Sequence, residues 1–346
     1  MGSTFTMTNI VYIIDSLSSF KLHDYRILKE IGFKIEVVEA QSFTRLAGKG
    51  FIKGFRGELF YAWYATSPGL ITVILGKFFR KPSIINVAGF EVCKQEDIKY
   101  GLRITNPEKV KYVRYTLRNA TRVIAVSQHM AEMINEVEPK SNIEIIYNSV
   151  DTSKFSPSQI LTKEKLLVSI GFLSKGNIIK KGFHTLLNAM PTILKHDRNI
   201  KLIIIGKKGE GYPVLLEMTK KLGIENNVIF TGFVDEEMLI SLLRKAMIYV
   251  HPAGHESFGI SIAEAMSCGL PVITTRRGAI PEVVGDAGLY VPFNDENSLA
   301  ENILTLLNNE ELRRELSMKA RERVVKMFDV RIRARRLKEL INKITA

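Results

Sequence analysis

Two glutamates, Glu256 and Glu264, stand eight positions apart across the predicted junction of a loop and a helix. An apolar, strand-like run at residues 247–250 precedes the loop, and Gly259 lies within it. Backbone N–H groups at a helix start bind phosphate, and a glycine there lets a ligand approach the backbone closely. Carboxylates accept hydrogen bonds from hydroxyl groups. The spacing therefore predicts a phosphate site with an acid on either side that binds hydroxyls.

An alternative explanation is two ordinary surface acids near a helix start, where negative charge is favoured. Ser257 is the expected cap of this helix, and Gly269 marks its expected end. The neighbouring residues favour a ligand site, because Phe-Gly follows the first acid and Ala-Met-Ser-Cys-Gly-Leu-Pro-Val-Ile follows the second. With these residues the stretch resembles the signature of retaining nucleotide-sugar glycosyltransferases of family 4. Further similarities lie at residues 124–127, 145–151, 228–233 and 281–284.

Length and composition favour two folded domains. A chain of 346 residues exceeds one typical domain and fits two. The two cysteines, Cys93 and Cys268, fall in different halves, and no Cys/His cluster has metal-ligand spacing, so we expect reduced thiols and no metal site. No apolar run has membrane-spanning length, and no secretory signal precedes the first strand. We expect a cytoplasmic protein, with a peripheral position at the inner face of a membrane as an extension of that prediction.

The net charge of +13 is concentrated in two segments. Residues 99–122 contain seven Lys/Arg and one acid, and residues 313–343 contain twelve Lys/Arg and four acids. Basic faces of this kind suit a nucleoside diphosphate, an anionic membrane surface, a lipid-phosphate acceptor or nucleic acid, and they also occur as solvated helix faces. No nucleic-acid recognition module is visible, so nucleic acid is not an expected partner.

Short apolar runs alternate with helical stretches, six runs in each half of the chain, which predicts βαβ units and parallel sheets. The expected strands are Ile10–Asp15, Lys34–Glu39, Leu59–Ala62, Ser83–Val87, Arg122–Ser127, Glu144–Tyr147, Leu166–Ile170, Lys201–Ile205, Val228–Thr231, Met247–Val250, Pro271–Thr274 and Leu289–Val291. The resemblance implies an α/β fold of the GT-B type, with two Rossmann-like, doubly wound domains facing a central cleft.

We expect an acceptor-side domain at residues 1–152 and a donor-binding domain at residues 153–346. A polar linker is predicted near the boundary, from Asn148 to Lys165. The last helix, about residues 329–346, is expected to pack back on the first domain.

The resemblance also implies roles for residues of the second half. Lys181 matches a family lysine that holds the diphosphate. The family arginine that accompanies it is replaced by Phe172, so Lys175 or Lys180 supplies the second charge, or the site uses one. Phe233 and Val234 match positions whose backbone contacts the nucleobase, with Phe233 in the core as the alternative. The remaining residues expected to bind the donor are Glu256, Ser257, Phe258, Gly259, Ile260 and Glu264.

In the first half, family members often carry a His-Gly pair that faces the transferred sugar. Here residues 88–91 are Ala-Gly-Phe-Glu, so the histidine is missing and Gly89 and Glu91 become the candidates. Residues 45–57 mix glycines, cations and aromatics, and we expect an exposed loop that contacts the acceptor or a membrane, or an ordinary surface loop.

The implied activity is a retaining glycosyltransferase that moves a sugar from a UDP- or GDP-linked donor to a hydroxyl acceptor, including a lipid-linked one. Front-face transfer requires no protein nucleophile, and the family needs no metal cofactor because protein cations replace Mg²⁺. Catalysis would then depend on Lys181 and Glu256, with Gly89 and Glu91 near the sugar. The alternatives are a non-catalytic nucleotide-sugar-binding protein of the same fold, or a GT-B polymer synthase or epimerase.

Overall fold

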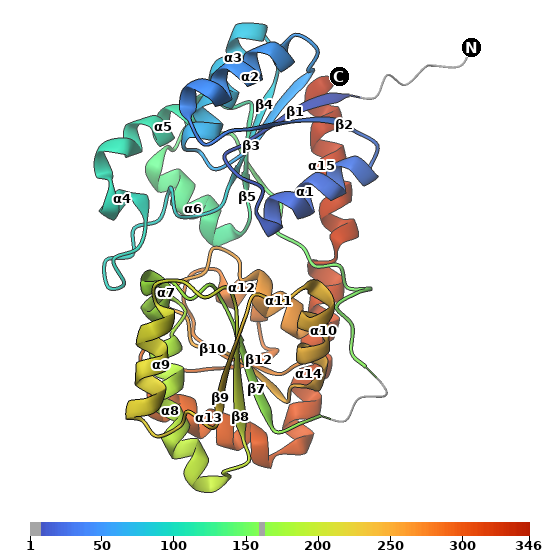
Figure 1. Ribbon diagram of the computed structural model, residues 1–346. Helices are drawn as coiled ribbons and strands as arrows, with labels where there is room; N and C mark the ends of the chain where they lie inside the picture. The colour runs from blue at the N-terminus through green and yellow to red at the C-terminus, as the bar shows by residue number, and fades with distance from the viewer. Residues whose placement is uncertain (1–7, 159–162) are drawn as a thin grey trace, which may run out of the picture. The chain divides into compact units, whose positions relative to one another are not determined.

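The computed structural model describes residues 8–158 and 163–346 (Figure 1). The chain divides into two compact units. The first contains Met1–Asn148 and Val330–Ala346, and the second contains Ser149–Asp329. The closing helix α15 (Val330–Thr345) thus belongs to the first unit. Part of the linker expected at residues 148–165 lies outside the described residues, at 159–162.

The first unit is built on a parallel sheet of six strands in the order β2-β1-β3-β4-β5-β6. The order reverses between β1 and β3. Helices on both faces of such a sheet bury its central strands, which explains why every residue of β1, β3 and β4 is buried and why most of them are apolar. The strand bounds are β1 Asn9–Ile14, β2 Lys34–Glu39, β3 Leu59–Trp63, β4 Ser83–Val87, β5 Arg122–Ala125 and β6 Ile143–Ile145.

Helices α2, α3, α5 and α6 follow one another across one face of this sheet, and α1 contacts α15. A short helix, α4, and a 3₁₀ turn, η1, precede α5. Within the described part of the chain, no helix combines the length and apolarity needed to cross a bilayer. The helix bounds are α1 Ser19–Glu30, α2 Phe43–Gly54, α3 Ser67–Phe79, α4 Leu102–Thr105, η1 Pro107–Lys109, α5 Val110–Asn119 and α6 Gln128–Val137.

The exposed loop predicted at residues 45–57 is wrong. Helix α2 occupies most of it, and the Ser42 hydroxyl caps the helix by accepting a hydrogen bond from the Arg45 amide. Two of its glycines are contact positions: a Cβ on Gly50 would lie 2.7 Å from Leu75, and one on Gly54 would lie 2.3 Å from the ring of Phe79, both on α3. Glycine therefore allows two helices to approach closely here, where the sequence pattern suggested a flexible loop.

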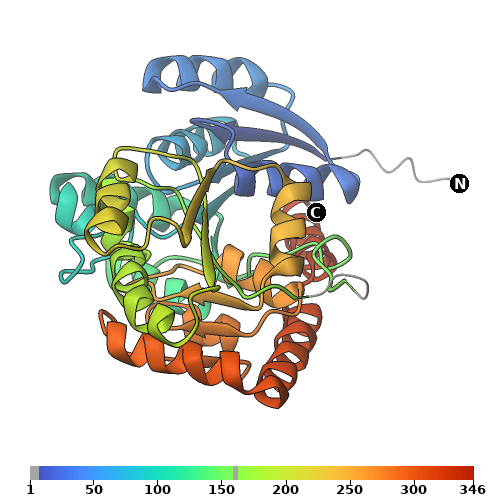
Figure 2. The same cartoon turned by 60° about the horizontal axis from the view of Figure 1, so that its bottom comes forward.

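The second unit has a parallel sheet in the order β12-β11-β10-β7-β8-β9, which reverses between β7 and β10. Figure 2 shows helices on both sides of this sheet. The strand bounds are β7 Leu166–Ile170, β8 Lys201–Ile205, β9 Val228–Gly232, β10 Ile248–His251, β11 Val272–Thr274 and β12 Gly288–Tyr290. The helix bounds are α7 Lys175–Lys180, α8 Phe183–His196, α9 Tyr212–Lys221, α10 Glu236–Lys245, α11 Ile260–Ser267, α12 Ile280–Val284, α13 Glu296–Asn308 and α14 Glu310–Met327.

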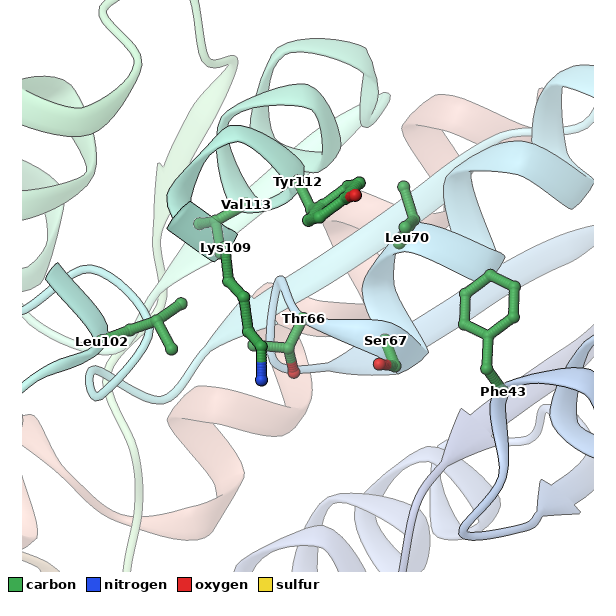
Figure 3. Close-up of a pocket in the computed structure, with 8 residues that line it drawn as sticks. All are labelled: Phe43, Thr66, Ser67, Leu70, Leu102, Lys109, Tyr112 and Val113. Atoms are coloured by element: carbon green, nitrogen blue, oxygen red, sulfur yellow. The ribbon is translucent and has the colours of Figure 1, made fainter. Parts of the chain in front are cut away.

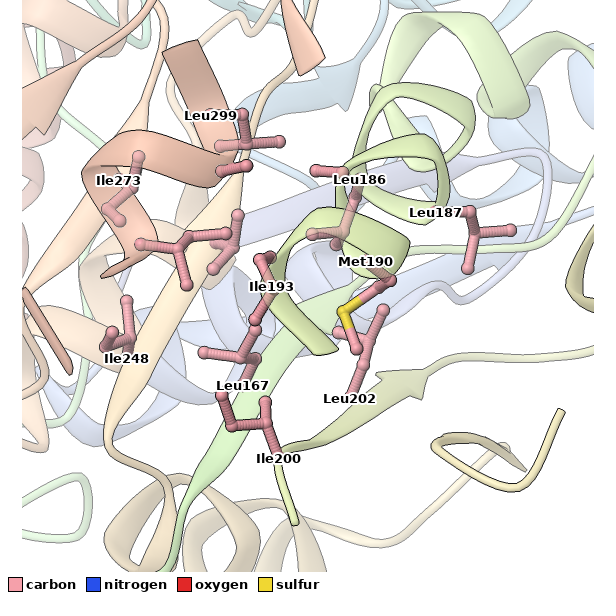
Figure 4. Close-up of a cluster of buried hydrophobic side chains, with 14 of the residues drawn as sticks. Leu167, Leu186, Leu187, Met190, Ile193, Ile200, Leu202, Ile248, Ile273 and Leu299 are labelled. Carbon is pink, nitrogen blue, oxygen red and sulfur yellow. The ribbon is translucent and has the colours of Figure 1, made fainter. Parts of the chain in front are cut away.

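The core of the second unit forms where α8 and α13 pack together on the sheet (Figure 4). Leu186 and Met190 of α8 lie among strand residues such as Leu167 and Leu202, all fully buried. This packing fixes the strands whose carboxyl ends carry the loops of the candidate site.

Candidate active site

The candidate site lies where the second sheet reverses its strand order. Strands β7 and β10 pair with each other. The strands that directly follow β7 in the chain extend the sheet on one side, and those that follow β10 extend it on the other. Ligands of open α/β sheets bind at the carboxyl ends of strands at such a point. The segment after β7 brings Lys181, and the loop after β10 brings Glu256.

Lys181 and Glu256 form an ion pair, with side chains only 16% and 10% exposed. His251 Nε2 lies 2.8 Å from the same carboxylate oxygen, Oε1, and must be the donor because an ionised carboxylate only accepts. Burial alone would raise the pKa of Glu256, but the charge of Lys181 and the bond from His251 outweigh it and hold the pKa well below its ordinary value. Burial lowers the pKa of His251 itself. The site therefore contains a cation and a permanently ionised acid at neutral pH.

His251 is the residue that sequence reasoning missed. It is fully buried at the end of β10. The only signal in the sequence was its position, at the end of a strand and five residues before Glu256. A histidine that ends an apolar strand beside a loop acid has two uses, core packing and acid positioning. The sequence does not distinguish them, whereas the 2.8 Å contact does.

Neighbouring segments hold the loop that carries Glu256 in one conformation. The Gly254 amide donates to the Lys180 carbonyl at 2.8 Å, and the Ala279 amide donates to the Glu256 carbonyl at 2.8 Å. Gly278 lies so close that a Cβ there would meet the Glu256 carbonyl oxygen at 2.3 Å. The loop is thus braced from both sides, and its charges are positioned before any ligand arrives.

Helix α11 begins at Ile260, and Gly259 precedes it with φ +96°, a conformation that favours glycine. The residue at the cap position is Gly259, so the expected cap position of Ser257 is wrong. Phe258 is buried and packs edge-on against Phe328, with ring centroids 5.2 Å apart, so its side chain anchors the loop in the core. What this junction offers a ligand is therefore its backbone, at the positive end of a helix.

Glu264 lies on α11, one turn beyond Ile260, and is partly buried. Burial raises the pKa of Glu264 to about 8, and the nearby charge of Glu236 adds to the effect. Glu264 is therefore mainly protonated at neutral pH, unlike Glu256. The predicted pair of acids consists of one ionised group and one neutral group.

Phe233 and Val234 follow β9. The Phe233 ring is 80% exposed, so the alternative that placed it in the core is wrong. A planar ligand that stacks on this ring would bury its exposed apolar face, which would stabilise the bound ligand. The same connection continues into Glu236, whose charge acts on Glu264, so this loop lies close to α11.

Gly89 and Glu91 lie after β4 in the first unit, whereas Lys181 and Glu256 lie in the second. Glu91 is fully buried, and its carboxylate accepts backbone N–H bonds from Ala65, Ala88 and Gly89 at 3.0–3.3 Å. Burial raises the pKa of Glu91, and the backbone bonds oppose that rise. This side chain braces the loop in which Gly89 has φ +124°.

Within residues 8–158 and 163–346, no group of three or more His, Cys, Asp and Glu side chains is arranged to hold a metal ion. The cation paired with Glu256 at the candidate site is Lys181.

Comparison with known families matches both halves of the chain. Residues 151–323 match the family "Glycosyl transferases group 1", and residues 46–154 match "Glycosyltransferase Family 4". An uncharacterized glycosyltransferase of Methanocaldococcus jannaschii is 30% identical over 281 residues, 80% of this chain and 72% of the relative.

Two relatives with named activities match over shorter stretches. N-acetyl-alpha-D-glucosaminyl L-malate synthase of Bacillus anthracis is 30% identical over 236 residues, 65% of this chain and 60% of the relative. Phosphatidyl-myo-inositol mannosyltransferase of Mycolicibacterium smegmatis is 31% identical over 186 residues, 52% of this chain and 46% of the relative. The matched stretch thus spans 60% of the first named relative's length and 46% of the second's.

Solved structures share the fold along nearly the whole chain. Anabaena HepE in complex with UDP and glucose superposes with a TM-score of 0.82 at 19% identity, covering 97% of this chain and 99% of that one. Sucrose-phosphate synthase from Thermosynechococcus elongatus gives a TM-score of 0.81 at 18% identity, with 97% and 98% covered. With two doubly wound units and both family matches, the chain belongs to the group 1, family 4-type glycosyltransferases of GT-B fold.

Proposed function

We propose that the chain transfers a hexosyl group from a UDP- or GDP-linked donor to a hydroxyl acceptor with retention of configuration. The observation that carries the proposal is the Lys181–Glu256–His251 cluster at the strand-order reversal of the second unit. Lys181 is paired with Glu256, and the loop that carries Glu256 leads to the amino end of α11. That arrangement suits a diphosphate leaving group, on which negative charge builds up during transfer.

Lys181 is suited to the diphosphate because an ammonium group has three N–H donors and Glu256 engages only one side of it. The bonds from Lys181 and His251 converge on Oε1 of Glu256. In the described part of the chain, no residue bonds to Oε2, which is then left to accept a hydroxyl of the transferred sugar. The Gly259 and Ile260 amides would add donors to the phosphate, and Glu264 and the Phe233–Val234 backbone would hold the nucleoside.

Because Phe172 replaces the family arginine, a second positive charge at the diphosphate must come from another residue. Lys180 is a better candidate for it than Lys175. Its charge already lowers the pKa of Glu256, so its field reaches the site. Protein cations at the diphosphate support transfer without a metal cofactor. We expect turnover to be insensitive to EDTA.

The alternative is a non-catalytic nucleotide-sugar binder, and two substitutions favour it: Phe172 at the arginine position and Ala88 at the histidine position. A GT-B polymer synthase or epimerase is a further alternative within enzymes. Product analysis separates them, since a synthase extends its product repeatedly and an epimerase releases no nucleoside diphosphate.

Release of nucleoside diphosphate from a panel of UDP- and GDP-sugars tests the proposal. Lys181→Ala should lower the rate by about 10²–10³-fold, the usual cost of removing one preorganised donor. Glu256→Gln should abolish transfer. Lys195→Ala, which removes an exposed lysine at the end of α8, is the matched control and should retain full activity. Wild-type turnover in Lys181→Ala, or donor binding without any release, would contradict the proposal.

We also propose that the chain acts at the cytoplasmic face of an anionic membrane. The basic segment at residues 99–122 supports this, because Tyr112 and Tyr115 are 50% and 41% exposed among its cations. Exposed aromatic rings beside Lys and Arg suit the boundary between headgroups and acyl chains.

A further inference from the structure

An apolar cavity of about 350 Å³ lies in the first unit (Figure 3). Five of its lining side chains present mainly carbon, and they come from α2, α3, α4 and α5: Phe43, Leu70, Leu102, Tyr112 and Val113. Small-molecule sites typically have volumes of about 300–1,000 Å³. None of these residues belongs to the candidate donor site.

Two large rings at this cavity remain exposed to solvent, Phe43 by 45% and Tyr112 by 50%. Contiguous exposed apolar surface lined by several elements marks ligand sites and partner sites more often than isolated exposed residues do. The cavity therefore has apolar surface that a hydrocarbon ligand would bury.

One end of the cavity is polar and positive. Figure 3 shows the Lys109 side chain running from just before α5 toward Thr66, and Ser67, the next residue, also lines the cavity. Helix α3 begins at Ser67, is 13 residues long and has no side-chain cap, so its positive end lies beside the same hydroxyls. Within the described residues, no carboxylate is paired with Lys109. A cation, two hydroxyls and a helix start together suit a phosphate.

The neighbouring face of the same segment adds positive charge. A second hollow of about 390 Å³ has no acid in its lining, which consists of Lys94, Arg103, Pro107, Val110, Lys111 and Arg114. Lys94 and Arg103 form ion pairs with Glu96 and Glu136, whereas no acid of the described residues pairs with Lys111 or Arg114. These two cations border the apolar cavity, which favours an anionic amphiphile over an apolar peptide or a neutral lipid.

We propose that this cavity binds the hydrocarbon chain of a phosphate-bearing lipid, with the phosphate at Lys109 and the start of α3, and that such a lipid is the acceptor. The acceptor role rests on the proposed glycosyltransferase function. The hydrocarbon chain fills the apolar lining, and the charged end remains at the polar mouth.

Calorimetric titration of the full chain with alkyl phosphates, kept below their micelle concentrations, tests this site. Affinity should rise roughly fourfold for each added methylene, the equivalent of about 0.8 kcal/mol per buried CH₂, and then level off when the cavity is full. Dodecanol should bind at least tenfold more weakly than dodecyl phosphate, and inorganic phosphate should not bind at the same concentrations.

Cavity-filling variants locate the binding. Ser67→Trp at an exposed position and Leu70→Trp should each weaken dodecyl phosphate binding at least tenfold, whereas Ile74→Trp, on the exposed surface of the same helix, should not. Lys109→Gln should weaken the phosphate ligand and leave dodecanol unchanged, with Lys99→Gln as the control of equal charge. Unchanged binding in both Trp variants, equal affinity for dodecanol, or no binding at all would overturn the proposal.

The same preparations are titrated with UDP and GDP. Nucleotide binding without dodecyl phosphate binding overturns the lipid site alone. Dodecyl phosphate binding without nucleotide binding contradicts the proposed function and removes the acceptor role from the lipid site.

Discussion

Glu256 and Glu264 differ in protonation at neutral pH although they belong to one loop and the helix that follows it. The charge of Lys181 keeps Glu256 ionised, whereas burial, together with the charge of Glu236, raises the pKa of Glu264 to about 8. The two carboxyl groups therefore have different hydrogen-bonding capacities. Glu256 only accepts, and Glu264 can donate through its O–H until it loses its proton.

If Glu264 accepts hydrogen bonds from ribose hydroxyls, nucleotide binding requires its ionised form. A pKa of about 8 then makes UDP or GDP bind about tenfold more tightly at pH 9 than at pH 7, because most Glu264 is protonated at pH 7. The nucleotide phosphates are already ionised across this range. Calorimetry between pH 6.5 and 9 measures the effect, and Glu264→Gln should remove it. A pH-independent wild-type affinity would show that Glu264 does not act as an acceptor.

The sequence predicted the types of the site residues but not their protonation. A lysine after one strand and a glutamate after another were identifiable because strand ends at an order reversal converge. Glu256 is paired with Lys181, His251 bonds to the same carboxylate, and Glu91 bonds to backbone amides. These three features depend on side-chain directions and burial. Neither property is encoded in spacing along the chain.

At the scale of elements, helix α2 offers a matched pair of glycines. A Cβ on Gly54 would clash with the Phe79 ring, whereas a Cβ on Gly48 would meet nothing within 4 Å. Gly54→Ala should destabilise the chain by about 1–3 kcal/mol through overpacking, despite the better helix propensity of alanine. Gly48→Ala should stabilise it by up to about 1 kcal/mol. Urea unfolding measures both, and equal effects of the two changes would exclude close packing as the role of Gly54.

Helix α15 is held in the first unit by a buried ion pair. Arg333 Nε donates to Asp24 Oδ1 at 2.8 Å, and the guanidinium also donates to the carbonyls of Ile146 and Tyr147 at 2.9 Å. Trp63 and Tyr61 donate to the other oxygen of Asp24. The Arg333 Nη2 donates to Asn86 Oδ1 at 3.2 Å, so each guanidinium nitrogen and both Asp24 oxygens have a partner, as buried charges require.

Arg333→Met should cost about 3–5 kcal/mol of unfolding free energy, because it leaves the Asp24 carboxylate buried without its cation. Arg336→Met on the same helix is the control: its bond to Glu144 is exposed and contributes at most about 1 kcal/mol. Hydrogen exchange of α15 amides locates the loss. A similar small change in both variants would mean that the buried pair contributes little.

Each predicted strand overlaps an observed one, because buried parallel strands are short apolar runs bounded by turns. The sequence failed where glycines serve packing, as in α2, and where contacts between distant segments fix a turn, as directly after α7. Lys181 and Gly182 illustrate the second case: a Cβ on Gly182 would meet the Pro252 carbonyl oxygen at 2.1 Å, a contact between distant segments.

At the scale of the whole molecule, the two basic segments differ in what their charges do. In residues 313–343, several arginines donate to backbone carbonyls: Arg313 to Leu306 and Leu307, Arg321 to Thr152, Phe155 and Ser267, and Arg323 to Glu282 and Val283. These cations hold the fold together. Arginines of residues 99–122 are also bonded within the protein, Arg103 to Glu136, Arg114 to the Val137 carbonyl and Arg118 to Glu138. The lysines of this segment, Lys99, Lys109 and Lys111, are instead exposed, and they lie in the same segment as the exposed Tyr112 and Tyr115, which makes it the expected membrane surface.

Vesicle flotation tests that expectation. The chain should float with vesicles that contain anionic phospholipid and not with neutral ones, and high salt should release it. Changing Lys109 and Lys111 together to Gln should weaken binding by about 2 kcal/mol, at about 1 kcal/mol for each cation near the surface. Changing Lys220 and Lys221 on α9 removes the same charge from the second unit and should have no effect. Equal flotation with neutral vesicles would contradict the proposed binding to an anionic membrane.

The most direct test of the donor site is a crystal structure of the chain with UDP or GDP. We expect diphosphate oxygens within hydrogen-bond distance, about 2.7–3.1 Å, of Lys181 Nζ and of the Gly259 and Ile260 amides. A nucleotide bound elsewhere in the chain, with Lys181 still paired only to Glu256, would contradict the proposed donor site and the roles assigned to its residues.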